Sequence, residues 1–213
     1  MDEKLSESVI IPVNGVRLEG DLIVPEGASG LIVFAHGSGS SRHSPRNRFV
    51  AEVLHDHGLG TLLFDLLTET EDREYETRFD IDLLTERLST ATDWLREHEG
   101  TRDMSLGYFG SSTGAAAALR AAAVRGTDVK AVVSRGGRVD LAAEQLPDVT
   151  ASTLFVVGGA DTTVLELNRS AFDHLSCTKD LQVIDGAGHL FEGDGELEAV
   201  ANIAAEWFDR HLS

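Results

Sequence analysis

The chain has 213 residues, 42% of them hydrophobic, and its 36 Asp and Glu outnumber 18 Lys and Arg to give a net charge of −18. This length is enough to bury a substantial core, so we expect a single domain over residues 1–213. Strong negative charge repels nucleic acids and anionic membranes, and no apolar run approaches the roughly 20 residues of a membrane-spanning helix. We therefore expect neither a nucleic-acid partner nor a membrane partner.

Three further features concern the cell compartment. The first residues, Met1-Asp2-Glu3-Lys4, are acidic where a signal peptide would be basic, which predicts a cytoplasmic location. A single cysteine, Cys177, excludes an internal disulfide and is expected to pack as a small apolar side chain. Only three of the basic residues are lysines. Because an acidic, lysine-poor surface stays hydrated in concentrated salt, we hypothesise that the source cell is halophilic or salt-tolerant.

Strands and helices alternate along most of the chain. Residues 7–13 and 16–24 alternate apolar and polar side chains around Asn14-Gly15, which predicts an antiparallel hairpin. The later apolar runs predict strands at 31–35, 60–65, 104–109, 129–134, 154–158 and 181–184, and helices at 47–56, 81–98, 115–123, 165–175 and 197–210. Apolar strands separated by helices predict a mostly parallel sheet that is covered on both faces. The acidic residues 68–78 are expected to form a solvated loop, with a gating role as the alternative, and the short connections leave no room for a lid domain.

The most informative motif is Gly110-Ser111-Ser112-Thr113-Gly114, between an apolar strand and an alanine-rich helix. A serine between two glycines on a sharp strand-to-helix turn is typical of the nucleophile elbow of a serine hydrolase. Glycines are needed because a Cβ at either position would collide with the neighbouring strand or helix. The sequence therefore predicts Ser112 as a nucleophile.

Two further strands end in side chains that would activate this serine. The strand before Gly158 leads to Asp161, and the last strand leads to His189, so that the chain order is Ser, Asp, His. Parallel strands place their sites at their carboxyl ends. An imidazole with a pKa near 6.5 can take the serine proton, and a carboxylate on its other nitrogen fixes the tautomer. Taken singly, these side chains also suit a turn serine, a helix N-cap and a surface histidine, and Asp65 is a rival acid.

An acyl-transfer site also needs two N–H donors for the oxyanion. One is expected to be the backbone N–H of Thr113, at the start of the alanine-rich helix, where the helix dipole is positive. The other is expected from Ser38, in the glycine-rich loop after His36.

Arginines gather around the predicted site in an otherwise acidic chain. Arg42, Arg46 and Arg48 follow the glycine-rich loop, and Arg135 and Arg138 follow another strand. We expect Arg42 and Arg138, together with His36, to contact the substrate, with the arginines clamping a carboxylate or phosphate. The alternative is that the arginines pair with local acids such as Asp140 and Asp161 or cap helix ends.

No cofactor or metal is expected. The sequence contains neither GxGxxG nor GxxxxGK[ST], the glycine-rich motifs of nucleotide-binding enzymes. His55-Asp56-His57 falls at a predicted helix end, where the two imidazoles would diverge, and the chemistry of a serine nucleophile needs no metal.

These motifs resemble those of small, lid-less α/β-hydrolases of the dienelactone-hydrolase-like group, over roughly residues 7–210. The resemblance rests on the elbow, residues 158–164, the loop His36-Gly37-Ser38-Gly39 and the segment Gly186-Ala187-Gly188-His189. It implies the α/β-hydrolase fold. Two departures stand out, since dienelactone hydrolases proper have a cysteine nucleophile where this chain has Ser112, and a proline where it has Thr162. Residues 36–48 and 134–138 also resemble hydrolase domains fused to phosphoribosyltransferase-like domains, which implies such a domain as a partner.

We therefore expect a serine hydrolase that cleaves small carboxylic esters or thioesters through an acyl-enzyme on Ser112. An amidase or a lactone hydrolase with the same three residues remains an alternative. So does a catalytically silent α/β-hydrolase that serves as a binding module.

Overall fold

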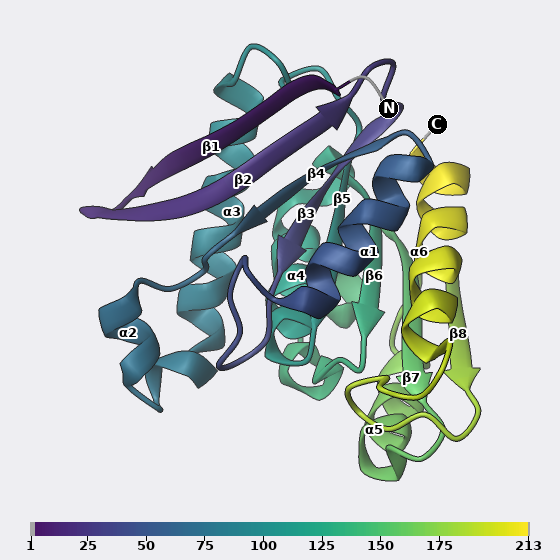
Figure 1. Ribbon diagram of the computed structural model, residues 1–213. Helices are drawn as coiled ribbons and strands as arrows, with labels where there is room; N and C mark the ends of the chain where they lie inside the picture. Colours follow the sequence, from purple (N-terminus) through teal and green to yellow (C-terminus); the bar gives the residue numbers. More distant parts are fainter. Residues whose placement is uncertain (1–2, 213) are drawn as a thin grey trace.

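The computed structural model describes residues 3–212, so Met1 and Asp2 of the acidic N-terminal segment lie outside the described residues. Its centre is an eight-stranded sheet with the order β1-β2-β4-β3-β5-β6-β7-β8 (Figure 1). The strands are β1 (Glu3–Val13), β2 (Val16–Pro25), β3 (Gly30–Ala35), β4 (Leu59–Phe64), β5 (Leu106–Ser111), β6 (Val129–Arg135), β7 (Ser152–Gly158) and β8 (Lys179–Ile184).

The sheet is mostly parallel, as the sequence predicts. Strands β4, β3, β5, β6, β7 and β8 are parallel to one another, whereas β2 is antiparallel to both β1 and β4. The expected N-terminal hairpin is therefore confirmed, and it extends one edge of the sheet. The register aligns the carboxyl ends of the central strands, since Gly110 pairs with Ala35, and Ser111 pairs with Arg135. Side chains that follow these ends therefore meet at one edge.

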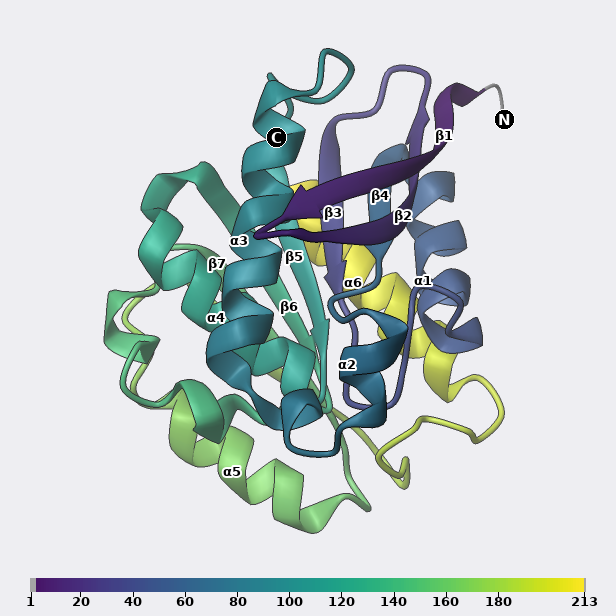
Figure 2. The ribbon, with the colours of Figure 1, turned by 90° about the vertical axis from the view of Figure 1, so that its left-hand side faces the viewer.

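Helices cover both faces of the sheet (Figure 2). One layer contains α1 (Pro45–Asp56) and α6 (Glu196–Leu212), and the other contains α3 (Ile81–Glu97), α4 (Thr113–Arg125) and α5 (Thr162–Phe172). Each layer packs its apolar side chains on the sheet and makes a separate buried core, because the central strands are buried on both faces. Helix α4 has small side chains where it meets the sheet, and its run of buried alanines lets the helix lie close to β5 and β6. The α/β-hydrolase fold class predicted from the sequence is confirmed by this architecture.

The acidic segment 68–78 differs from the expected loop. It contains a short helix, α2 (Glu69–Arg73), and it ends in a 3-10 turn at Thr77–Phe79. Elsewhere in the chain, 3-10 turns occur at 126–128, 139–142 and 146–148. Thr68 and Glu71 form a capping box, in which each side chain accepts a hydrogen bond from the other residue's backbone N–H. Glu71 also binds the buried Arg87 of α3 at 2.8 Å. The segment is therefore solvated over much of its length, including residues 73–76, but it is partly helical instead of the expected loop because the capping box and the contact with Arg87 fix a short helix there.

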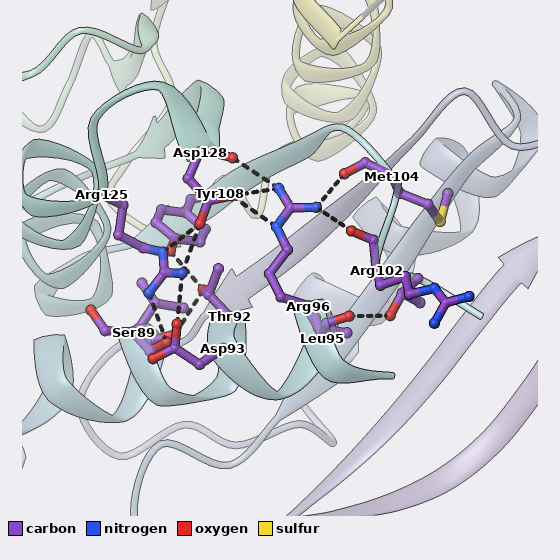
Figure 3. A network of polar contacts seen from close by, with 12 residues as sticks. Ser89, Thr92, Asp93, Leu95, Arg96, Arg102, Met104, Tyr108, Arg125 and Asp128 are labelled. Carbon is purple, nitrogen blue, oxygen red and sulfur yellow. Dashed lines mark hydrogen bonds and ion pairs between the residues drawn. The ribbon is translucent and has the colours of Figure 1, made fainter. Parts of the chain in front are cut away.

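A polar network joins α3, α4 and β5 at their buried contact (Figure 3). Arg96 and Arg125 both donate hydrogen bonds to the carboxylate of Asp128, at 2.8 and 2.9 Å. Burial alone would raise the pKa of Asp128, but these hydrogen bonds hold it below its usual value. Beneath them, the hydroxyl of Thr92 donates to a backbone carbonyl and lies 2.7 Å from the hydroxyl of the fully buried Tyr108. The tyrosine hydroxyl is therefore the donor in that pair.

The change Tyr108→Phe should lower the free energy of unfolding by about 1 kcal/mol, because it removes one buried hydrogen bond and almost no apolar surface. For a domain of this size the melting temperature should fall by roughly 2–4 °C. Tyr75→Phe is the matched control, because Tyr75 is 71% exposed and should give the wild-type value. Equal melting temperatures for the two variants would contradict a stabilising role for the Tyr108 hydroxyl.

Candidate active site

The turn between β5 and α4 has the geometry of the predicted elbow. Ser112 has φ +50° and ψ −120°, a conformation that L side chains rarely adopt. A Cβ built on Gly110 would lie 2.5 Å from Cα of Ala115, and one on Gly114 would lie 2.0 Å from the carbonyl oxygen of Ala35. The steric expectation for the two glycines is therefore confirmed. Although Ser112 occupies the N-cap position of α4, its hydroxyl makes no capping bond, so the oxygen is available to the adjoining cavity.

The predicted acid and base lie together at the same edge of the sheet. Nδ1 of His189 is 2.7 Å from a carboxylate oxygen of Asp161. Asp161 stands at the N-cap of α5 but makes no capping bond, so its interaction is with the histidine. His189 and Ser112 both line a cavity of about 430 Å³. The rival acid, Asp65, is bound instead by the backbone and guanidinium of Arg42.

The two predicted oxyanion donors are linked to each other. Thr113 is the first residue of α4, a position whose N–H has no partner within the helix. The N–H of Ser38 donates to the hydroxyl oxygen of Thr113 at 3.0 Å. This bond holds the glycine-rich loop against the elbow, where a Cβ on Gly37 would lie 3.1 Å from the Ser112 Cβ. The Ser38 N–H was expected to be free for substrate, and in this structure it is already engaged.

The residues expected to contact substrate lie outside the lining of this cavity. His36 is buried, and its Nε2 accepts the backbone N–H of Leu66 at 2.9 Å. Arg42 binds the carboxylates of Asp65 and of Glu19, which lies on β2 of the hairpin. Arg138 donates two hydrogen bonds to Asp140, at 2.9 and 2.8 Å, which is the local pairing that the sequence offered as the alternative. These three side chains are engaged with the protein itself.

Two other arginines line the cavity instead, namely Arg46 and Arg135. Arg135 is the last residue of β6 and pairs with Ser111 in the register of the sheet, so its position follows from the strand order. A usable signal was present in the sequence. The strand that follows the elbow in an α/β chain often pairs with the elbow strand, so its last residue lies beside the nucleophile.

Among residues 3–212, no group of three or more His, Cys, Asp and Glu side chains is arranged to hold a metal ion. Within the same residues no helix is long and apolar enough to cross a membrane.

Solved structures similar to this chain are hydrolases and esterases. A dienelactone hydrolase from Anabaena variabilis is 52% identical over 98% of this chain and 99% of that one, with a TM-score of 0.95. The enzyme Est1E from Butyrivibrio proteoclasticus is 17% identical over 95% of this chain and 99% of that one, with a TM-score of 0.79. An esterase from Pyrococcus furiosus is 17% identical over 98% of this chain and 92% of its own length, with a TM-score of 0.82. The last two show the shared fold alone.

Curated relatives carry a different name. Two proteins from strains of Mycobacterium tuberculosis, provisionally named phosphoribosyl transferases, are each 53% identical to this chain over 206 residues. The match covers 97% of this chain but only 46% of each relative, so the chain spans about half of their length. No family model matches the chain.

The change Gly114→Ala should prevent folding or lower the melting temperature by more than 10 °C, because backbone must move to relieve a 2.0 Å contact. Gly188→Ala is the matched control beside His189, since nothing lies within 4 Å of the added Cβ. Thermal unfolding followed by circular dichroism makes the comparison. A Gly114→Ala protein as stable as the control would show that the turn can open at little cost.

Stability should depend on pH through His36. Burial lowers the pKa of His36 and outweighs the Gly37 carbonyl and the charges of Asp65 and Asp72, which raise it. Below pH about 6.5 the His36 imidazole of the unfolded chain takes up a proton, whereas the buried imidazole of the folded chain stays neutral until its lower pKa is reached. The contribution of His36 to the free energy of unfolding is therefore complete above pH about 6.5. It is lost as the pH falls through the lowered pKa of His36 in the folded protein. Urea unfolding between pH 7 and 5 should show a steeper loss for wild type than for His36→Gln, by up to ~1.4 kcal/mol per pH unit. Equal slopes would contradict this assignment.

Proposed function

The chain belongs to the dienelactone-hydrolase-like group of α/β-hydrolases, and from this membership we propose that it is a serine hydrolase of small carboxylic esters or thioesters. The observation that carries the proposal is the placement of Ser112. This serine is held on a strained turn at the rim of the cavity that His189 also lines, and His189 is hydrogen-bonded to Asp161. The hydroxyl, the imidazole and the carboxylate have the chain order and the neighbours of a Ser-His-Asp triad.

In the proposed reaction Oγ of Ser112 attacks the carbonyl carbon of the substrate and gives its proton to Nε2 of His189. Asp161 accepts the Nδ1–H of His189, which keeps Nε2 unprotonated before the attack and stabilises the imidazolium afterwards. The tetrahedral intermediate collapses, and the imidazolium returns the proton to the departing alcohol or thiol. A water molecule, deprotonated by the same histidine, then hydrolyses the acyl-enzyme and regenerates the serine.

The developing oxyanion would be received at the start of α4. The Thr113 N–H lies at the positive end of the helix, next to the reacting serine. The Ser38 N–H would be the second donor once it exchanges the Thr113 hydroxyl for the substrate oxygen. This exchange replaces one hydrogen bond with a stronger, charge-assisted one as negative charge develops, so it favours the transition state over the ground state.

The relative from Anabaena variabilis favours a lactone as a second candidate substrate. That protein is named a dienelactone hydrolase, and a lactone is an internal ester that the same attack would open. The alcohol then stays attached to the acyl group, so ring opening and hydrolysis give a single product. A panel of esters, thioesters and lactones of graded size separates the candidates, and the cavity volume of about 430 Å³ favours small acyl groups.

We also propose a phosphoribosyltransferase-like domain as a partner of this hydrolase. The support is that the chain matches about half the length of relatives provisionally named phosphoribosyl transferases. Purification of this protein from its source tests the partner separately from the activity. A phosphoribosyltransferase-like domain in the purified complex would support the partner, and its absence would contradict it. A cytoplasmic location is proposed as well, because the chain has a single cysteine and therefore no internal disulfide.

The change Ser112→Ala should lower kcat by about 10⁶, as expected when the nucleophile of a triad is removed. The fold should survive, because the hydroxyl makes no capping bond in the turn. Hydrolysis of a short p-nitrophenyl ester gives the rate, and a fluorophosphonate probe gives the extent of covalent labelling.

Ser105→Ala is the control for this experiment, because Ser105 precedes β5 at its opposite end. It should keep the wild-type rate and labelling. A Ser112→Ala protein that retains a tenth of the activity would exclude Ser112 as the nucleophile. Wild-type protein that neither reacts with the probe nor cleaves any member of the panel would indicate a silent binding module.

A further inference from the structure

The charge of the cavity beside Ser112 is opposite to that of the chain. The chain has 36 acidic and 18 basic residues, yet the titratable side chains that line the cavity are Arg46, Arg135, His43 and His189. No aspartate or glutamate of the described residues is among the lining. The closest acid to this pair of arginines is Glu192, 3.7 Å from Arg46, and the side chain of Glu192 is 72% exposed. The cavity is therefore a local site of positive charge.

Arg135 is the more unusual of the two arginines, because it is buried without a partner. Its exposed fraction is 8%, and its guanidinium makes no hydrogen bond or ion pair with any side chain or backbone group of residues 3–212. Nη1 is completely buried, and the guanidinium lies 5.9 Å from the ring centroid of Phe109. Burial, with the charge of Arg46 as a second cause, lowers the pKa of Arg135 to about 10, so the group stays charged at neutral pH.

Other arginines of the chain show what such a group normally contacts. Arg96 and Arg125 are both less buried than Arg135, and both bind carboxylates (Figure 3). An unpaired buried charge costs several kcal/mol unless something compensates it. These more exposed arginines therefore each have a carboxylate partner, whereas Arg135, which lines the reaction cavity, has none among residues 3–212. This arrangement is expected where the compensating anion is a ligand.

Arg46 and its helix complete the positive side of the cavity. Arg46 is in the first turn of α1, whose N-cap is Ser44, and both residues line the cavity. The N-terminus of this 12-residue helix carries partial positive charge and suits an anion. Arg46 and Arg135 come from different elements, so their planar groups can approach one ligand from two directions. The loop between β3 and α1 adds Ser40 and Ser41 to the lining.

We propose that Arg135 and Arg46 form a phosphate subsite beside Ser112, so that the substrate is an ester or thioester that carries a phosphomonoester group. Two guanidiniums match the two negative charges of such a group. Its three terminal oxygens can accept hydrogen bonds from the paired N–H donors of both guanidiniums at once. The two oxygens of a carboxylate would already be satisfied by the paired N–H donors of one guanidinium. Phosphate therefore fits the pair of Arg135 and Arg46 better than a carboxylate does. The substrate assignment rests on the proposed esterase function, whereas the anion subsite stands on the cavity alone.

Calorimetric titration with inorganic phosphate tests the subsite without requiring turnover. Wild-type protein should bind phosphate at a fixed ionic strength set with KCl, and should bind acetate at least tenfold more weakly. Arg46→Gln should raise the dissociation constant for phosphate about tenfold, and Arg135→Gln should raise it more than tenfold. Arg102→Gln removes the same charge from an exposed side chain that pairs with Asp103, and should bind phosphate as wild type does.

The melting temperature in phosphate-free buffer separates a ligand-binding arginine from a structural one. Arg135→Gln should melt no lower than wild type, because it removes a buried charge that has no partner among residues 3–212. A lower melting temperature with an unchanged dissociation constant would assign Arg135 to the scaffold and overturn the proposal. If Arg135→Gln does not fold, Arg46→Gln, at a half-buried position, provides the same test of phosphate affinity.

Matched esters then connect the subsite to the substrate. The acetate esters of 4-hydroxyphenyl phosphate, 4-hydroxybenzoate and 4-methoxyphenol differ mainly in charge. Wild-type kcat/KM should be highest for the phosphate, and the ratio of phosphate to neutral ester should fall at least tenfold in Arg135→Gln. Equal or greater preference for the benzoate would overturn the phosphate assignment. Phosphate binding by a protein that hydrolyses none of the three would contradict the proposed function, whereas hydrolysis without phosphate binding would contradict the subsite.

Discussion

The close approach of β3, β5 and α4 at the elbow is the constraint on which the rest of the site depends. Gly110 and Gly114 leave no space for a side chain, so the helix begins immediately at the end of the strand. Ser112 is thereby forced into a positive φ, and its hydroxyl makes no capping hydrogen bond to the helix that follows. The strain is localised at one residue because the surrounding strands are buried and in register on both sides.

Electrostatic pairing determines which side chains remain available around this turn. Arg42 and Arg138 are neutralised by acids of the protein, and Asp161 is directed to His189. Arg135 has no such acid among the described residues, although its burial makes an unpaired charge costly there. Packing and pairing therefore have different effects on the site, since packing positions the serine and pairing determines the charge of the surrounding cavity.

The elbow and the ends of the strands were predictable because each depends on neighbours in sequence. Ser112 is defined by its two glycines and by the strand and helix beside it, and the hairpin by Asn14-Gly15. The role of Arg42 depends on a contact with the distant Asp65, which composition does not specify. Arg138 pairs with Asp140, two residues away, so its local alternative could be read from the sequence. Helix α2 is an intermediate case. Its capping box is a local signal, but the acidic composition of the segment suggested a solvated loop.

The two edge strands of the sheet have a consequence for how separate molecules behave. Within residues 3–212, strands β1 and β8 each have one side without a neighbouring strand in the sheet order, and such edges can pair with the edges of other molecules. A net charge of −18 keeps copies apart near neutral pH through mutual repulsion. As the pH approaches the isoelectric point of about 4.7, that repulsion disappears. Surface carboxylates therefore determine the colloidal stability of the protein in mild acid, and self-association through the sheet edges should begin as these carboxylates take up protons.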